Sequence, residues 1–221
     1  NDPASKPGLN FGLVAYYPFD GNASDMSGNG NHGTVSGAVL GTDRHGEAGK
    51  AYVFDGVDDK IDSSNDKASP EAGTMSAWIN VNALQSYNVA IDLGSEQYMI
   101  FTYLESLYFR AGLPQSFVPY PTSTGNWIQV SMTWSGPGNP FQSFVNGVQV
   151  ANNASQGTND FGEAGILRIG QTLVGFSYWF SGSIDDVRIY DRALSASEVA
   201  ALYQMESALP TGSVTTTKLD L

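Results

Sequence analysis

The sequence predicts an all-β protein, built as a sandwich or a barrel, with one short helix near its C-terminal end. Short segments in which apolar and polar residues alternate recur along most of the 221-residue chain. Alternation with a period of two is typical of half-buried strands. Turn-forming residues separate these segments, and one segment has a helical pattern. A chain of this length is enough for a single all-β domain with a well-buried core.

Twelve segments between residues 10 and 194 are expected to form strands. In residues 73–82 every second residue from Met75 is apolar, and in residues 127–135 the same holds from Ile128. Asn146-Gly147 lies between two apolar segments and predicts a two-residue hairpin turn. The expected strands are residues 12–19, 33–40, 51–56, 59–64, 73–82, 87–94, 97–104, 106–112, 127–135, 141–151, 164–171 and 180–191.

The expected helix follows a capping-box pattern. Ser195 can accept a hydrogen bond from an early helical N–H group, and Glu198 can reach back to the N-terminal end of the helix. Apolar residues then recur at helical spacing, so we expect a short amphipathic helix that ends near Met205. These apolar residues are Val199, Leu202 and Tyr203.

The composition excludes several classes of protein. Hydrophobic residues make up 41% of the chain and aromatic residues 12%, which is too many for a disordered segment. The net charge of −12 repels phosphate groups, so nucleic acid and anionic membrane surfaces are poor partners. No apolar stretch approaches the roughly 20 residues of a membrane span. The chain has no cysteine, which excludes disulfides and thiolate metal sites.

Both ends of the chain have the chemistry of linkers. Residues 1–9 and 208–221 are rich in Pro, Gly, Ser and Thr, and no signal peptide is visible. We therefore expect one domain over residues 10–207 that belongs to a longer protein. The acidic chain, rich in Gly, Asn, Ser, Asp and Thr, is typical of an exported bacterial protein, so an extracellular or cell-surface location is expected.

Three motifs together resemble a known family. They are LVAYYPFDGN at residues 13–22 followed by SGNGNHG at 27–33, GKAYVFDGVDD at 49–59, and FSGSIDDVRIYDRALS at 180–195. In this order and spacing they resemble the laminin-G-like jelly-roll domains of the concanavalin A-like lectin and glucanase superfamily. The resemblance spans about residues 10–205 and implies two antiparallel sheets, one convex and one concave, packed as a jelly-roll sandwich. Members of the family include carbohydrate-binding modules, adhesin domains and peptide-binding domains.

The resemblance also implies a structural calcium ion that joins the end of the first strand to the last strand. The matching positions are Asp20, Asn22, Ser27, His32 and Asp185. Calcium prefers six to eight oxygen ligands, so Ser27 and His32 would offer main-chain carbonyls. The alternative is that the polar side chains of this loop form turns with the backbone, as Asp and Asn commonly do. Asp58-Asp59 is a weaker metal candidate, because a turn between two strands explains it.

The sequence does not predict an enzyme. Retaining glycoside hydrolysis needs two carboxyl groups about 5–5.5 Å apart, and no motif supplies such a pair. Asp185 and Asp186 are adjacent, so a regular strand would point them to opposite faces. The two histidines, His32 and His45, lie in polar Gly-rich loops without an obvious nucleophile.

A binding role requires exposed aromatic rings and hydrogen-bonding groups on the concave sheet. In residues 107–110, alternation directs Leu107 and Phe109 to the core. It directs Tyr108 and Arg110 to the outer face. The alternative is that many aromatic residues of this region fill the core. The predicted ligand-binding residues are Tyr98, Tyr108, Arg110, Gln129 and Trp179.

The sequence therefore predicts a non-catalytic, calcium-containing binding module of a larger secreted enzyme or adhesin. The expected partner is a polysaccharide or another glycan, with neighbouring domains of the same chain as further partners. One alternative is an adhesin or scaffold domain that binds a protein or peptide. A second alternative is a polysaccharide hydrolase or lyase.

Overall fold

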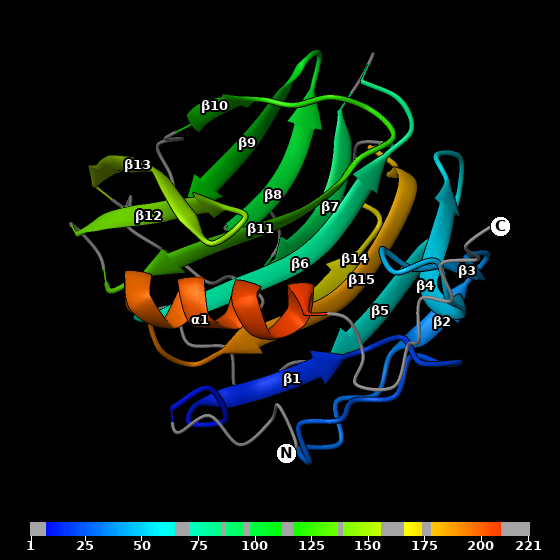
Figure 1. The fold of residues 1–221 in the computed structure, drawn as a ribbon, viewed down its shortest axis with the longest axis horizontal. Helices are drawn as coiled ribbons and strands as arrows, with labels where there is room; N and C mark the ends of the chain where they lie inside the picture. The colour runs from blue at the N-terminus through cyan, green and yellow to red at the C-terminus, as the bar shows by residue number, and fades with distance from the viewer. Residues whose placement is uncertain are drawn as a thin grey trace, which may run out of the picture.

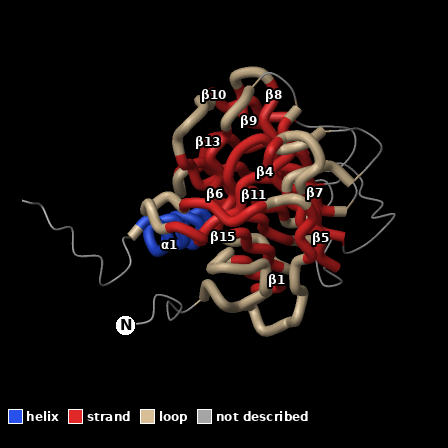
Figure 2. Tube along the Cα trace, turned by 90° about the vertical axis from the view of Figure 1, so that its right-hand side faces the viewer, coloured by secondary structure: helices blue, strands red, loops and turns tan. Residues whose placement is uncertain are grey.

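The computed structural model describes residues 8–64, 71–84, 87–94, 98–111, 117–136, 139–155, 166–173 and 178–208. Two antiparallel sheets pack face to face, and helix α1 (Ala196–Ser207) lies on the outer face of one of them (Figure 1). Figure 2 shows the helix at one side of the strands. The prediction of a two-sheet antiparallel sandwich with one short C-terminal helix is confirmed.

The first sheet has eight strands, and β15 (Ser181–Tyr190) lies at its centre. One edge of β15 pairs with β6 along its length, while the other edge pairs first with β4 and then with β1. The remaining strands, in chain order, are β1 (Leu13–Tyr17), β3 (Val39–Thr42), β4 (Ala48–Asp55), β6 (Gly73–Val81), β11 (Trp127–Trp134), β12 (Pro140–Val145) and β13 (Val148–Ser155).

The second sheet has seven strands, in the order β10-β9-β8-β7-β14-β5-β2. These are β2 (Thr34–Ser36), β5 (Lys60–Ser64), β7 (Asn88–Leu93), β8 (Tyr98–Tyr103), β9 (Ser106–Ala111), β10 (Phe117–Pro121) and β14 (Ile166–Ile169).

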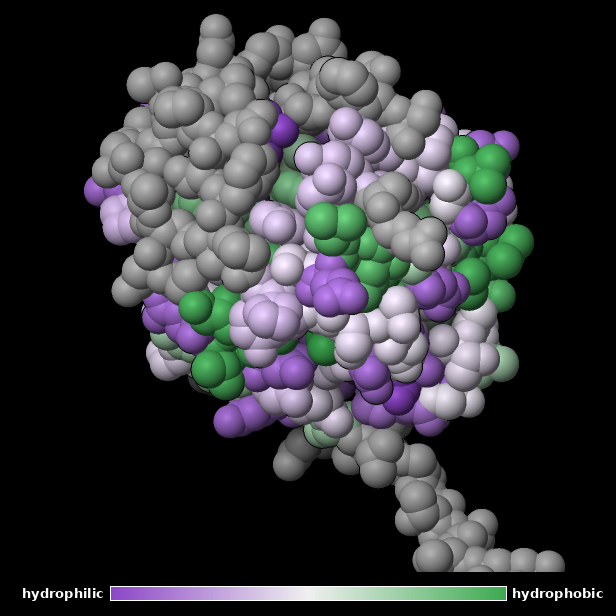
Figure 3. Space-filling view, turned by 90° about the horizontal axis from the view of Figure 1, so that it is seen from above, coloured by the Kyte–Doolittle hydropathy of each residue, from purple (hydrophilic) through white to green (hydrophobic). Residues whose placement is uncertain are grey.

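The core lies between the two sheets and follows the predicted alternation. Met75, Ala77 and Ile79 of β6 are fully buried there. On the surface seen in Figure 3, the described hydrophobic residues form small patches separated by hydrophilic ones. No helix among the described residues has the length and hydrophobicity needed to cross a membrane.

Two predicted strands are each divided in the structure. Residues 33–40 contain all of β2 and the start of β3, which belong to different sheets. Gly37 makes the crossing with a positive φ of 80°, and a Cβ atom there would lie 2.0 Å from Asp59 Oδ1. Residues 141–151 form the predicted hairpin, in which Asn146 and Gly147 both have positive φ, as a type I′ turn requires. Strand β10 was not predicted.

Helix α1 has the predicted capping box. The Ser195 hydroxyl accepts a hydrogen bond from the Glu198 N–H, and the Glu198 carboxylate accepts one from the Ser195 N–H. The Arg192 guanidinium, together with these bonds, lowers the pKa of Glu198 to about 2. Val199 and Leu202 pack on the outer face of the first sheet against Phe144. The predicted linkers, residues 1–9 and 208–221, lie almost entirely outside the described residues.

Candidate functional site

The outer face of the second sheet carries a group of aromatic rings that we call the tyrosine surface. Its neighbouring rings are in contact: the ring centroids of Tyr87 and Tyr103 lie 4.3 Å apart, and those of Tyr87 and Tyr178 lie 4.5 Å apart. Phe101 is buried beneath them and stacks on Tyr108 at 5.3 Å. Phe101, Tyr103, Tyr108 and Tyr178 belong to a hydrophobic cluster that is separate from the core, and the exposed Tyr87 contacts this cluster through its ring.

The rings lie beside a line of polar groups that crosses five adjacent strands, which we call the polar row. The strand register places its members opposite one another, and their chain neighbours, such as Ile61, Leu167 and Ile169, point into the core. Arg168 Nε donates to Asp62 Oδ1 at 2.6 Å. The polar members are Asp62, Arg168, Asp92 and Arg110, and the buried thioether of Met99 lies in the row between Asp92 and Arg110. Asp92 and Arg110 are buried, whereas Asp62 and Arg168 are partly exposed. Phe101 on β8 and Tyr108 on β9 lie opposite each other, two residues along their strands from Met99 and Arg110. Aromatic rings and hydrogen-bonding groups therefore lie side by side on one face of the second sheet.

Three of the five predicted ligand-binding residues lie at this face. Tyr108 and Arg110 point outward from β9, as the alternation predicts, although Arg110 is largely buried. Trp179 is half-buried, and its main chain pairs with that of Gln171. The Gln171 side chain accepts a hydrogen bond from Arg168, so Trp179 lies next to the polar row.

The other two predictions are wrong in location. Tyr98 is fully buried in the core, where its ring stacks on Trp134 at 4.1 Å. Because Tyr98 and Tyr103 are five residues apart on one strand, they must point to opposite faces. Gln129 does lie on an outer face, but on that of the first sheet, where α1 covers it and Glu206 accepts its hydrogen bond.

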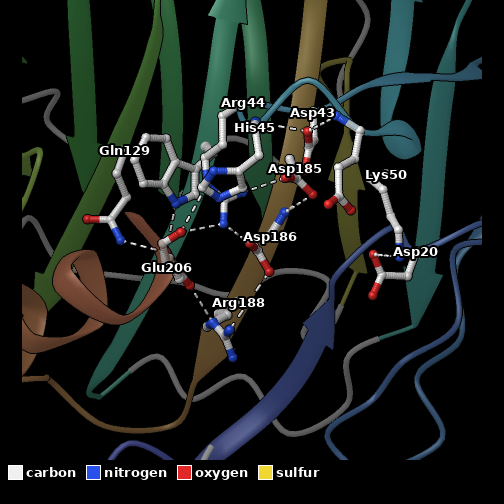
Figure 4. Close-up of polar contacts among 12 residues, drawn as sticks. Asp20, Asp43, Arg44, His45, Lys50, Gln129, Asp185, Asp186, Arg188 and Glu206 are labelled. Carbon is white, nitrogen blue, oxygen red and sulfur yellow. Dashed lines mark hydrogen bonds and ion pairs between the residues drawn. The ribbon is translucent and has the colours of Figure 1, made fainter. Parts of the chain in front are cut away.

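A second candidate region lies on the outer face of the first sheet, beside the C-terminal end of α1. A cavity of about 650 Å³ opens there between the loops that follow β1, the β3–β4 hairpin and the bulge of β15. Five charged residues at its inner wall form what we call the arginine clasp (Figure 4). They are Arg44, Asp185, Asp186, Arg188 and Glu206.

A β-bulge explains why both adjacent acids belong to the clasp. Asp186 has a positive φ of 47°, and the register of β15 against β6 shifts between Asp185 and Arg188. The prediction that the two acids point to opposite faces is therefore wrong, because both carboxylates contact Arg44. Burial and the neighbouring Asp186 raise the pKa of Asp185, and Arg44 opposes them by favouring the charged form.

The Gly-rich loop after β1 is organised around Asp25. Its carboxylate accepts hydrogen bonds from the N–H groups of Tyr16, Ser27 and Asn31, at 3.0, 2.8 and 2.9 Å. The His32 imidazole accepts the N–H of Asp25 itself. Burial opposes ionisation of Asp25, but these hydrogen bonds outweigh it and lower its pKa. This side chain holds the loop in shape, which is the turn alternative stated above.

The five predicted calcium ligands have other partners for their side chains. Asp20 forms an exposed ion pair with Lys50 at 3.0 Å, and Asn22 Oδ1 accepts the Ser24 N–H at 2.8 Å. The Ser27 hydroxyl and the His32 ring are engaged with Asp25, and Asp185 is held by Arg44. Among the described residues, three close acidic side chains occur in the turn of Asp55, Asp58 and Asp59. Calcium binding at the predicted positions stays a prediction.

We predict that Asp25→Ala lowers the free energy of unfolding by about 2–3 kcal/mol, because three backbone N–H groups lose a charged acceptor. Urea denaturation measures this change. Since the folded-state pKa of Asp25 is lowered, its contribution is complete above about pH 4 and is lost as the pH falls through that pKa. Asn22→Ala, which removes one exposed acceptor, is the matched control and should change stability by less than about 1 kcal/mol. Equal effects of the two variants would contradict the central role of Asp25.

Comparisons with known proteins agree with the fold. The model of the family described as the concanavalin A-like lectin/glucanases superfamily matches residues 55–200. Domain 4 of AbnA, an extracellular GH43 arabinanase from Geobacillus stearothermophilus, was solved in complex with arabinotriose. It is 22% identical to this chain with a TM-score of 0.66, and the match covers 87% of this chain and 98% of that domain.

Toxin binding domains share the same fold. The binding domain of botulinum neurotoxin serotype D is 14% identical with a TM-score of 0.68, and that of Paraclostridial Mosquitocidal Protein 1 is 18% identical with a TM-score of 0.68. Each match covers 88% of this chain and 52% of the toxin domain, so this chain spans about half of their length. At these identities the likeness shows the fold alone. No curated protein matches the sequence.

Proposed function

The chain belongs to the concanavalin A-like lectin/glucanase superfamily, and from this premise we propose that it is a non-catalytic module that binds a neutral polysaccharide on the tyrosine surface. The observation that carries the proposal is the position of the aromatic rings directly beside the polar row. The C–H faces of sugars stack on aromatic rings, and side chains such as those of Arg110 and Arg168 bind hydroxyl groups.

The charges of the polar row favour a neutral ligand over an acidic one. Arg168 is paired with Asp62 at 2.6 Å, and Asp92 lies opposite Arg168 on the next strand. The row contains two basic and two acidic residues. Lys60, beside the row, also contacts Asp62, at 3.2 Å, so the row and Lys60 together carry only one excess positive charge for a uronate or a sulfate. The net charge of −12 adds a repulsion against anionic polysaccharides.

At the tyrosine surface, the state of Asp62 supports binding over hydrolysis. Burial opposes ionisation of Asp62, but Arg168 and Lys60 outweigh it and lower its pKa. A general acid in a glycoside hydrolase needs the opposite, a raised pKa. Asp92 is fully buried and accepts hydrogen bonds from the Thr172 hydroxyl and from the Leu173 N–H, at 3.0 and 2.7 Å, so the protein itself engages its carboxylate.

The complex of the arabinanase domain with arabinotriose makes arabinan the first polysaccharide to try. That arabinanase is described as extracellular, and polysaccharides of this kind are met outside the cell. The proposal therefore includes a secreted or cell-surface parent protein, in which this module holds the substrate or surface for a neighbouring domain.

Affinity electrophoresis in gels that contain arabinan, xylan, β-glucan or polygalacturonate tests the proposal. We expect one of the neutral polymers to retard the protein and polygalacturonate to leave its mobility unchanged. Tyr108→Ala should weaken the retarding interaction about tenfold, because it removes a stacking ring. Phe11→Ala is the matched control, since Phe11 is an exposed aromatic residue that packs on Arg192 instead.

Three results would contradict the proposal: no retardation by any neutral polymer, retardation by polygalacturonate alone, or equal losses in the Tyr108 and Phe11 variants. Release of reducing ends from any of the polymers would show a hydrolase instead.

A further inference from the structure

The Arg44 guanidinium is surrounded by oxygen atoms of the kind that bind metal ions. Nη1 donates to Asp185 Oδ2 at 2.5 Å, and Nη2 donates to Asp186 Oδ2 at 2.7 Å. Nε and Nη2 both donate to the main-chain carbonyl of Glu206, at 3.1 and 2.7 Å. All three guanidinium nitrogens are therefore engaged by two carboxylates and one carbonyl (Figure 4).

These contacts join three segments that are far apart in the sequence. Arg44 lies in the β3–β4 hairpin, the two acids lie in the bulge of β15, and Glu206 lies in the last turn of α1. The guanidinium also lies over the ring of Trp78, at 4.6 Å from its centroid. The side chain is only 10% exposed, so water screens these interactions weakly.

A calcium ion coordinated by Asp185 would need the carboxylate that Arg44 already holds. Two carboxylates and a carbonyl are a typical part of a calcium coordination shell, and a planar guanidinium can satisfy the same oxygens with hydrogen bonds. Asp20, the other predicted carboxylate ligand, pairs with Lys50. Both predicted carboxylate ligands are paired with side-chain cations, so the predicted set does not fit calcium unless these two pairs are broken.

We propose that the Arg44 guanidinium is the built-in cation of this domain and takes the place at Asp185 that the sequence assigned to calcium. The domain then folds, and binds its ligand, without calcium.

The packing around the two acids explains why a cation is required there. The side chains of Asp185 and Asp186 are 3% and 11% exposed, and they are consecutive residues in one bulge. The other nearby cation, Arg188, is 3.8 Å from Asp186 and forms its short contact, 2.6 Å, with Glu206. Without Arg44, Asp186 would keep the hydrogen bond from the Tyr16 hydroxyl at 2.7 Å, but two neighbouring carboxylates would be buried with no cation in short contact, which is unfavourable.

The first test uses the unmodified protein, purified without added calcium. We expect less than about 0.1 calcium ion per chain by elemental analysis, and a Tm that changes by less than about 1 °C with excess chelator or with 1 mM calcium. Stoichiometric calcium, or a Tm that falls on chelation, would overturn the proposal and restore the calcium prediction.

The second test removes the guanidinium. Arg44→Ala should lower the Tm by roughly 5–10 °C, and calcium should raise the Tm of this variant more than that of the unmodified protein. Lys50→Ala is the matched control, because it removes another positive charge at the same cavity from a pair that is exposed on both sides, and its Tm should stay within about 2 °C.

Equal Tm values for Arg44→Ala and the unmodified protein would contradict the proposal. If Arg44→Ala does not fold, Arg44→Lys serves as the second variant. It keeps the positive charge but lacks the planar guanidinium that reaches three acceptors, so its Tm should be measurable but lower than that of the unmodified protein. A Tm of Arg44→Lys equal to that of the unmodified protein would then count against the proposal.

Discussion

Replacing Glu206 by alanine is expected to lower the free energy of unfolding by about 3–5 kcal/mol, which corresponds to a Tm lower by roughly 10 °C for a domain of this size. The side chain of Glu206 lies between α1 and the first sheet, where three side chains contact its carboxylate. Its carboxylate contacts Arg188 Nε at 2.6 Å, and it accepts hydrogen bonds from Trp78 Nε1 at 2.9 Å and from Gln129 Nε2 at 2.7 Å. Its side chain is 2% exposed.

The large effect follows from what the substitution leaves behind. Arg188 would keep its position over the Tyr16 ring and a longer contact with Asp186, but its buried charge would lose its short ion pair. The N–H groups of Trp78 and Gln129 would also lose their acceptor under the helix. A buried charge left with one long ion contact, together with two donors that have lost their acceptor, costs more than the lost contacts themselves.

Urea denaturation followed by circular dichroism measures the change. Glu206→Gln, which keeps the shape and one acceptor oxygen but not the charge, should fall between the alanine variant and the unmodified protein. Gln204→Ala is a control on the exposed side of the same helical turn and should change the free energy of unfolding by less than about 0.5 kcal/mol. A Glu206→Ala variant as stable as that control would refute the role given to this acid.

Much of the fold could be predicted from local patterns. The alternation in β6 and β11, the Asn146-Gly147 turn and the capping box at Ser195 each depend on residues close in the sequence. Where a local pattern was not sufficient, the prediction was wrong. In residues 33–40, Gly37 sends the chain from one sheet to the other, and this change of sheet depends on its close approach to Asp59.

The candidate site was predicted less well, because it depends on long-range contacts and on one irregularity. Arg44 meets Glu206 across 162 positions of the chain, and nothing near Arg44 in the sequence indicates this partner. The bulge at Asp186 reverses the expected direction of one acid, and a two-residue period cannot reveal it. Strand parity places Tyr98 and Tyr103 on opposite faces, so only one of the two can lie on the outer face.

Tyr98→Ala is expected to lower the free energy of unfolding by about 3–5 kcal/mol, because it removes a fully buried aromatic ring from the core. The ring stacks on Trp134, which in turn packs so closely on Gly73 that a Cβ atom there would lie 2.2 Å from the indole. Trp134 has no room to move on that side, so we expect the cavity to remain largely unfilled. Tyr98→Phe keeps the ring and should cost much less.

Tyr98→Ala and Tyr108→Ala should therefore have opposite consequences. The two residues lie on neighbouring strands of the same sheet, but one faces the core and the other faces outward. Well below its Tm, Tyr98→Ala should keep its affinity for the polysaccharide in the gel assay while its urea midpoint falls. Tyr108→Ala should lose affinity about tenfold with a much smaller change in the urea midpoint. If both variants lost stability and affinity together, the outer face of the second sheet would be part of the fold and not a separate binding surface.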